Sequence, residues 1–104
     1  MKPLSADDTR RYVGQVARHR GWVVNADEKM TTALVEGLSR QSVRFGRPYC
    51  PCRYIDGDEK DADVVCPCQY AAADIAEHGQ CYCGLFLSPL KNIREVQSIP
   101  ERRT

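Results

Sequence analysis

This chain of 104 residues contains six cysteines, all of them between Cys50 and Cys83. No other feature of the sequence constrains its possible fold and function as much. An even number of cysteines in a short chain is typical of a secreted disulfide framework, which needs an export signal. Residues 1–8 contain no apolar segment of the signal-peptide kind, and no stretch approaches the roughly 18 apolar residues of a membrane span. We therefore expect a soluble, cytoplasmic protein whose cysteines bind a metal or carry out thiol chemistry.

Two amphipathic helices are predicted in the N-terminal half. A capping-box pattern begins at Ser5, and apolar residues then recur at helical spacing as far as Gly21. The same kind of pattern at Asn25 precedes a second apolar stripe, which ends before Gly46. With 42% hydrophobic and 28% charged residues, the composition is that of an ordinary globular chain, and the length predicts one domain over residues 1–104.

The C-terminal half is predicted to be broken into short pieces by proline and glycine. A turn is expected over residues 56–58, and an alanine-rich helix over Gln69–His78. Ser88 can begin a last short helix that turns three apolar side chains inward, and the tail beyond Pro100 is expected to fray. The inward side chains are Leu90, Ile93 and Val96. No run alternates apolar and polar residues long enough to predict a sheet, so the predicted fold class is mostly α, a small domain of short helices.

The cysteines are arranged as three tripeptides: Cys50-Pro51-Cys52, Cys66-Pro67-Cys68 and Cys81-Tyr82-Cys83. In an extended segment, residues separated by one other residue point to the same side, so the two thiols of each tripeptide are expected to point in the same direction. In the first two tripeptides the central proline restricts its own backbone and favours an extended conformation in the preceding cysteine. A disulfide within one tripeptide would be strained. Bonds or metal ligands are therefore expected to join different tripeptides.

Three kinds of chemistry remain open on spacing alone. A structural zinc site takes four thiolates, but its usual Cys-x-x-Cys knuckle is absent. An iron-sulfur cluster also takes four cysteines and would leave two for a redox-active disulfide, although the Cys-x-x-Cys-x-x-Cys run of a simple ferredoxin is missing too. The third alternative is that all six are plain thiols.

The flanks of the tripeptides carry a resemblance to a known family. The segments are Phe45-Gly46-Arg47-Pro48-Tyr49-Cys50-Pro51-Cys52-Arg53, then Cys66-Pro67-Cys68, then Cys81-Tyr82-Cys83-Gly84-Leu85-Phe86-Leu87-Ser88-Pro89. In order and in flanking residues they are similar to the catalytic (beta) chain of ferredoxin:thioredoxin reductase. The resemblance covers roughly the last two thirds of the chain, and it implies a mostly α-helical fold with the cysteine-bearing loops around an iron-sulfur cluster.

The resemblance also implies roles for each cysteine. Cys50, Cys66, Cys68 and Cys81 would be the ligands of a 4Fe-4S cluster. Cys52 and Cys83 would form the redox disulfide, with Cys52 as the thiol that attacks a target. The implied activity is a disulfide reductase that takes single electrons from ferredoxin and reduces thioredoxin or a similar small dithiol protein. Because nothing in the sequence matches the family's small variable subunit, we expect a stand-alone prokaryotic form, a monomer or homo-oligomer.

Several other residues bear on function. The family has a histidine in the middle of the third tripeptide where this chain has Tyr82, so proton transfer there would need another group, for which His78 is a candidate. Arg44, Arg47 and Arg53 flank the first tripeptide and could form a basic rim or tune a cluster. With a net charge of +1 and no recognised motif, neither nucleic acid nor a membrane is an expected partner. The alternatives are a zinc-stabilised interaction module and a redox sensor without turnover.

Overall fold

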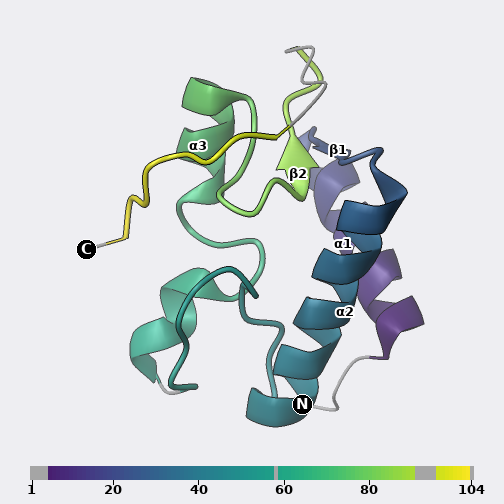
Figure 1. The fold of residues 1–104 in the computed structure, drawn as a ribbon, viewed down its shortest axis with the longest axis vertical. Helices are drawn as coiled ribbons and strands as arrows, with labels where there is room; N and C mark the ends of the chain where they lie inside the picture. The colour runs from purple at the N-terminus through teal and green to yellow at the C-terminus, as the bar shows by residue number, and fades with distance from the viewer. Residues whose placement is uncertain (1–4, 58, 91–95, 104) are drawn as a thin grey trace.

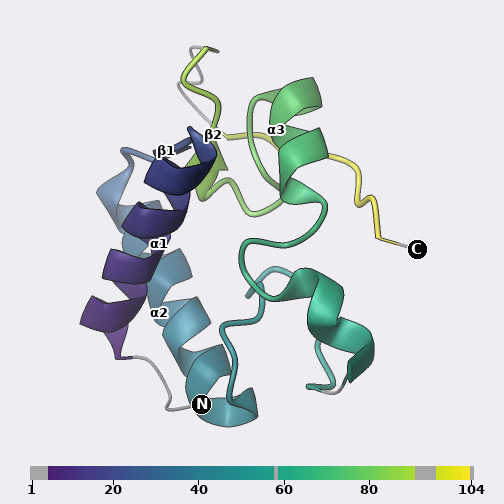
Figure 2. The same cartoon turned by 180° about the vertical axis from the view of Figure 1, so that it is seen from behind.

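The computed structural model describes residues 5–57, 59–90 and 96–103, and it consists mainly of helices (Figures 1 and 2). The elements are α1 (Ala6–Arg20), β1 (Val23–Val24), α2 (Glu28–Phe45), the 3-10 helix η1 (Glu59–Val64), α3 (Ala71–His78) and β2 (Phe86–Leu87). The predicted mostly α fold class is confirmed. None of the helices in this part of the chain has the length and apolar character needed to cross a membrane.

Helix α1 begins and ends where the sequence predicts. The Ser5 side chain accepts a hydrogen bond from the Asp8 amide at 3.1 Å, which satisfies one of the free N–H groups of the first turn. At the other end Gly21 adopts a left-handed conformation with φ of 75°, which glycine tolerates without strain. Acidic residues in the first turn and basic residues in the last turn stabilise the helix, because their charges are opposite to those of the helix dipole at each end.

Helix α2 is capped by Asp27, two residues after the predicted cap. The Asp27 carboxylate accepts a hydrogen bond from the Met30 amide at 3.1 Å. The predicted cap, Asn25, instead donates its side-chain N–H to the carbonyl of Gly84 at 2.9 Å. This hydrogen bond joins the segment before α2 to the residue that follows the third cysteine tripeptide. The predicted end of the helix is confirmed at Gly46, which has φ of 82°.

The structure contains a small antiparallel sheet that was not predicted from the sequence. Val23 pairs with Leu87 and Val24 with Phe86, two residues in each strand, which is too short for any alternation to show. The 3-10 helix η1 was not predicted either. Helix α3 begins at Ala71 instead of the predicted Gln69.

The predictions for the C-terminal segment were partly wrong. Leu90 is 93% exposed instead of inward, whereas Val96 is partly buried. Ile93 and most of the predicted last helix lie outside the described residues, as does Asp58 of the predicted turn. The predicted fraying beyond Pro100 is contradicted, because Arg102 pairs with Asp74 and the tail crosses α3 (Figure 1).

The core lies between the two long helices and the cysteine loops. α1 and α2 pack side by side (Figure 2), and their buried residues Val13, Ala17, Val35 and Leu38 meet buried cysteines and Phe86 in one cluster. Gly37 allows the first tripeptide to approach α2, since a Cβ there would lie 2.8 Å from the Cβ of Pro51. The long helices thus form one wall of the space into which the cysteines project.

Candidate redox cysteine site

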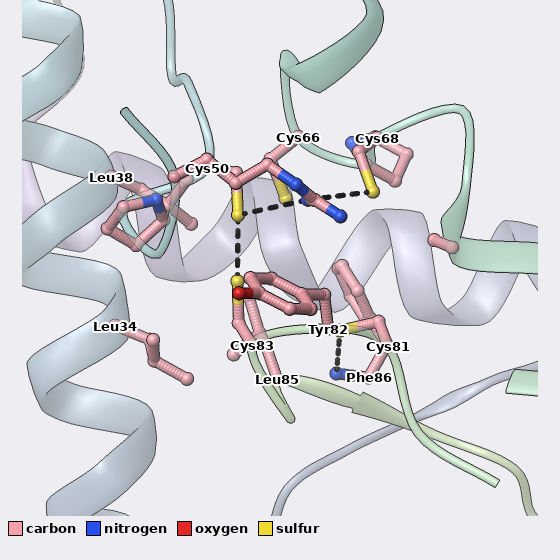
Figure 3. Close-up of a pocket in the computed structure, with 14 residues that line it drawn as sticks. Leu34, Leu38, Cys50, Cys66, Cys68, Cys81, Tyr82, Cys83, Leu85 and Phe86 are labelled. Carbon is pink, nitrogen blue, oxygen red and sulfur yellow. Dashed lines mark hydrogen bonds between the residues drawn. The ribbon is translucent and has the colours of Figure 1, made fainter. Parts of the chain in front are cut away.

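The three tripeptides, far apart in the sequence, meet at one pocket (Figure 3). Five of the six cysteines line it: Cys50, Cys66, Cys68, Cys81 and Cys83. Leu34 and Leu38 of α2, together with Leu85 and Phe86, provide apolar walls. The fold therefore gathers five of the thiols in a mostly apolar pocket.

Backbone hydrogen bonds fix the first two tripeptides against each other. Tyr49 and Val65 form an isolated antiparallel bridge. The Cys50 amide donates to the Val64 carbonyl at 2.8 Å, and the Cys66 amide donates to the Pro48 carbonyl at 2.9 Å. The peptide bond between Cys66 and Pro67 is cis. These contacts place Cys50 and Cys66 on neighbouring segments of the backbone.

The third tripeptide is held by β2. The Cys81 amide donates to the Phe86 carbonyl at 3.0 Å, and the Phe86 amide donates back to the Cys81 sulfur at 3.4 Å. The Gly84 amide closes a turn by donating to the Cys81 carbonyl at 2.9 Å, with Gly84 at φ of 78°. Tyr82 and Cys83 lie inside this turn.

The expected extended geometry of the tripeptides is therefore wrong for the first and third. Pro51 and Cys52 lie in a turn, as do Tyr82 and Cys83, and the turn in the third tripeptide is closed by the Gly84 hydrogen bond. As a result the two thiols of the first tripeptide differ in exposure: Cys50 is buried and Cys52 is exposed.

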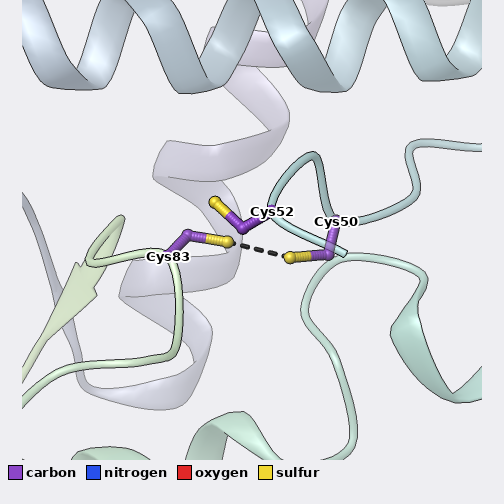
Figure 4. Close-up of side chains that lie close together, drawn as sticks. All are labelled: Cys50, Cys52 and Cys83. Carbon is purple, nitrogen blue, oxygen red and sulfur yellow. Dashed lines mark hydrogen bonds between the residues drawn. The ribbon is translucent and has the colours of Figure 1, made fainter. Parts of the chain in front are cut away.

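The predicted ligands and the predicted dithiol differ in burial. Cys50, Cys66, Cys68 and Cys81 are all buried, whereas Cys83 is half-buried and Cys52 is exposed. The sulfurs of Cys50, Cys52 and Cys83 lie within 4.8 Å of one another, and the Cys50 and Cys83 sulfurs are 2.8 Å apart (Figure 4). The first and third tripeptides thus meet through their sulfurs, and the shortest contact joins Cys83 to Cys50 instead of Cys52.

The environment separates the thiols by acidity. Burial raises the pKa of Cys66 well above its ordinary value, and it also raises that of Cys68. Hydrogen bonds with Cys50 and Cys83 lower the pKa of Cys52 to about 4, while those with Cys50 and Cys52 raise the pKa of Cys83. Among the three adjacent sulfurs, the pKa is therefore lowered at the exposed Cys52 and raised at Cys50 and Cys83.

Arg53 is a buried cation beside the sulfurs. Its side chain is 3% exposed, and its Nη1 donates to the sulfurs of Cys50 at 3.5 Å and Cys68 at 3.4 Å. Burial opposes the charged form, but the Glu101 carboxylate and the neighbouring cysteines outweigh it and raise the pKa of Arg53. A positive charge at this point favours thiolates on both cysteines.

This donor set fits a thiophilic metal centre. Cys50, Cys66 and Cys68 are buried thiols with raised pKa values, so losing their protons requires a compensating positive charge inside the pocket. Iron or zinc bound to sulfur supplies that charge, and N–H groups aimed at the sulfurs, here from Arg53 and Phe86, are a usual feature of iron-sulfur sites.

Comparison with known proteins places the chain in a family. The family described as ferredoxin thioredoxin reductase catalytic beta chain matches residues 3–102. The chain belongs to this family. Its members are oxidoreductases that act on disulfides, and the family resemblance seen in the sequence is confirmed. The assignment of all 104 residues to one domain stays a prediction.

Curated relatives in this family are named as ferredoxin-thioredoxin reductase catalytic chains. The protein of Porphyra purpurea is 31% identical over 83 residues, which covers 77% of this chain and 67% of the relative. That of Synechocystis sp. is 31% identical over 97 residues, covering 88% and 77%. The chloroplastic protein of Spinacia oleracea is 33% identical over 88 residues, and the match covers 82% of this chain but only 57% of the relative.

The other predicted residues are distributed unevenly around the site. Arg44 and Arg47 are exposed, and of the three flanking arginines Arg53 alone reaches the sulfurs. His78, on the last turn of α3, contacts Glu77 at 3.7 Å and does not line the cysteine pocket. No local pattern in the sequence pointed to Glu101, which lies 48 residues from its partner Arg53.

Proposed function

We propose that this protein reduces a disulfide of thioredoxin or a similar small dithiol protein with electrons from reduced ferredoxin. Cys50, Cys66, Cys68 and Cys81 would hold a 4Fe-4S cluster, and Cys52 and Cys83 would form the redox disulfide. The observation that carries the proposal is the division of the cysteines by burial: the four proposed ligands are the four buried ones, and the proposed nucleophile is the exposed one.

The cluster, when bound, would supply one-electron transfer next to a two-electron disulfide. Two electrons and two protons convert the Cys52–Cys83 disulfide to two thiols. The Cys52 thiolate then attacks the target disulfide, which forms a mixed disulfide and releases one target thiolate. Cys83 attacks Cys52 in that mixed disulfide, restores the original disulfide and releases the second target thiolate.

The positions of the two thiols suit these roles. Cys52 is exposed and has a lowered pKa, so it can meet a protein partner as a thiolate. Cys83 lies within 4.8 Å of Cys52 but has a raised pKa, so it would stay protonated until the mixed disulfide forms. A cytoplasmic location and the state of a monomer or homo-oligomer stay predictions of the sequence.

A metal assay with a visible spectrum tests the proposal first. Purified without oxygen, the protein is expected to be brown and to contain about four irons and four sulfides per chain. A colourless protein with stoichiometric zinc would contradict it and favour the zinc-stabilised interaction module.

Trapping tests the thiol chemistry. The Cys83→Ser variant keeps Cys52 and cannot resolve a mixed disulfide, so it should form a stable covalent complex with thioredoxin. The matched Cys52→Ser variant should form none. A complex formed equally by both variants would overturn the assignment of the attacking thiol and would favour a redox sensor over a reductase.

A further inference from the structure

The buried guanidinium of Arg53 contacts sulfurs, aromatic rings and a carboxylate. Nη1 faces the sulfurs of Cys50 and Cys68. The ring of Tyr82 lies 4.5 Å from the guanidinium carbon and that of Tyr70 lies 5.6 Å away. Aromatic faces stabilise a guanidinium without competing for its N–H groups, so these stay available for hydrogen bonds in the plane.

The carboxylate of Glu101 fixes which edge of the guanidinium faces the sulfurs. Arg53 Nε donates to Glu101 Oε2 at 2.6 Å, and Nη2 donates to Oε1 at 2.8 Å. A bidentate pair of this kind sets orientation as well as energy. Because Nε and Nη2 face Glu101, Nη1 is directed at the two sulfurs.

Glu101 is itself held in place by the C-terminal tail. Arg102 Nε contacts Asp74 Oδ1 of α3 at 2.5 Å, and Arg103 contacts Asp61 of η1 at 2.8 Å. The Arg103 amide also donates to Glu101 Oε1 at 3.0 Å. The tail therefore spans two elements on either side of the second tripeptide and places one carboxylate against Arg53.

We propose that Glu101 is a positioning residue for the redox centre: it orients Arg53 so that this cation donates N–H groups to the sulfurs of Cys50 and Cys68 and thereby raises the reduction potential. The inference rests on the proposed function, since it needs an iron-sulfur centre on those cysteines. A nearby cation and N–H donors both stabilise the more reduced, more negatively charged state of such a centre.

Glu101→Ala separates positioning from charge, because the two effects have opposite signs. Removing a carboxylate next to the centre would raise the midpoint potential if Arg53 kept its place. If Glu101 positions Arg53, the potential falls instead. We expect at least a tenfold shift toward the oxidised form at a fixed solution potential, which is a fall of about 59 mV for one electron. Arg53→Lys, which keeps the charge but loses the planar fork, should shift it in the same direction.

The measurement is a redox titration followed by the visible spectrum, with iron and sulfide content determined on each variant. The control is Glu28→Ala, which removes a carboxylate from the Arg10–Glu28 pair between α1 and α2 and should leave the potential unchanged. An unchanged or higher potential in Glu101→Ala, with the cluster retained, overturns the inference. A wild-type protein without iron overturns the proposed function instead, so the two failures are distinguishable. A second result would also overturn the inference. In it, Glu101→Ala loses its iron, whereas Arg53→Lys keeps both its iron and the wild-type potential.

Discussion

The helix pair α1–α2 and the cysteine loops are held by different kinds of interaction. In the helix pair, caps at Ser5 and Asp27 and apolar residues at helical spacing act within short stretches of sequence. In the loops, the contacts join distant residues, such as Arg53 with Glu101 and Cys50 with Cys83. The first region is therefore expected to form without a metal, whereas the second is expected to depend on the proposed metal centre, which would join its buried cysteines as thiolates.

Metal removal should produce the largest effect and confine it to the loops. Without a bound metal, the buried cysteines would keep their protons and their sulfurs would lose the proposed ligation that joins the three tripeptides. Hydrogen exchange read by mass spectrometry should show lost protection in residues 48–53, 64–70 and 79–87. Protection of α1 should persist. Equal loss of protection in α1 would contradict the difference between the two regions.

Arg102→Ala is expected to destabilise the loop side of the molecule. Asp74 is fully buried, accepts a hydrogen bond from Arg102, and its Oδ2 has no hydrogen-bond partner in the described part of the chain. Leaving this carboxylate unpaired should cost about 2 kcal/mol of unfolding free energy, measured by urea denaturation. The double variant with Asp74→Asn should recover part of the loss, and a double variant as unstable as the sum of both changes would count against this ion pair.

Gly37→Ala tests the point where the two regions touch. Alanine favours helix over glycine by about 0.5–1 kcal/mol, but its Cβ would lie 2.8 Å from Pro51. We expect a net loss of about 1 kcal/mol and a changed visible spectrum, because the first tripeptide must move. Gly14→Ala in α1 is the matched control, since a Cβ there meets nothing within 4 Å, and it should stabilise the protein. Equal effects of the two substitutions would show that the contact with Pro51 is unimportant.

Asp27→Ala should produce the most local effect and leave the loops unchanged. Loss of the cap of α2 costs about 1 kcal/mol, which thermal unfolding followed by circular dichroism would detect. The spectrum of the metal centre should match the wild type. Ser5→Ala, which removes the cap of α1, is expected to behave alike, and a large change in the spectrum of either variant would contradict the independence of the helix pair.

The difference between local contacts in the helix pair and long-range contacts in the cysteine loops also determines how much of the structure could be predicted from the sequence. The ends of α1, the end of α2 at Gly46 and the closure of α3 at Gly79 were predicted, because each follows from a cap or a glycine within a few residues. Strands of two residues carry no periodicity, and Asn25 has the right chemistry for a cap but bonds to Gly84, which is distant in sequence.

In the site, the sequence predicted that the three tripeptides come together but not how. Their turns depend on contacts such as that between Gly84 and Cys81, and the burial of Arg53 depends on a tail that local patterns predict to be frayed. Charged pairs between residues distant in sequence, such as Arg103 with Asp61, hold that tail against the rest of the fold.

The proposed function rests on a division of the six cysteines into four buried cluster ligands and a redox-active pair, Cys52 and Cys83, which is more exposed. The most direct test is the iron and sulfide content of Cys52→Ser beside Cys68→Ser, both purified without oxygen, with disulfide reduction measured on each. We expect Cys52→Ser to keep the iron content of the wild type and to lose turnover, whereas Cys68→Ser should lose the iron. Equal loss of iron from both variants, or full turnover by Cys52→Ser, would contradict this division.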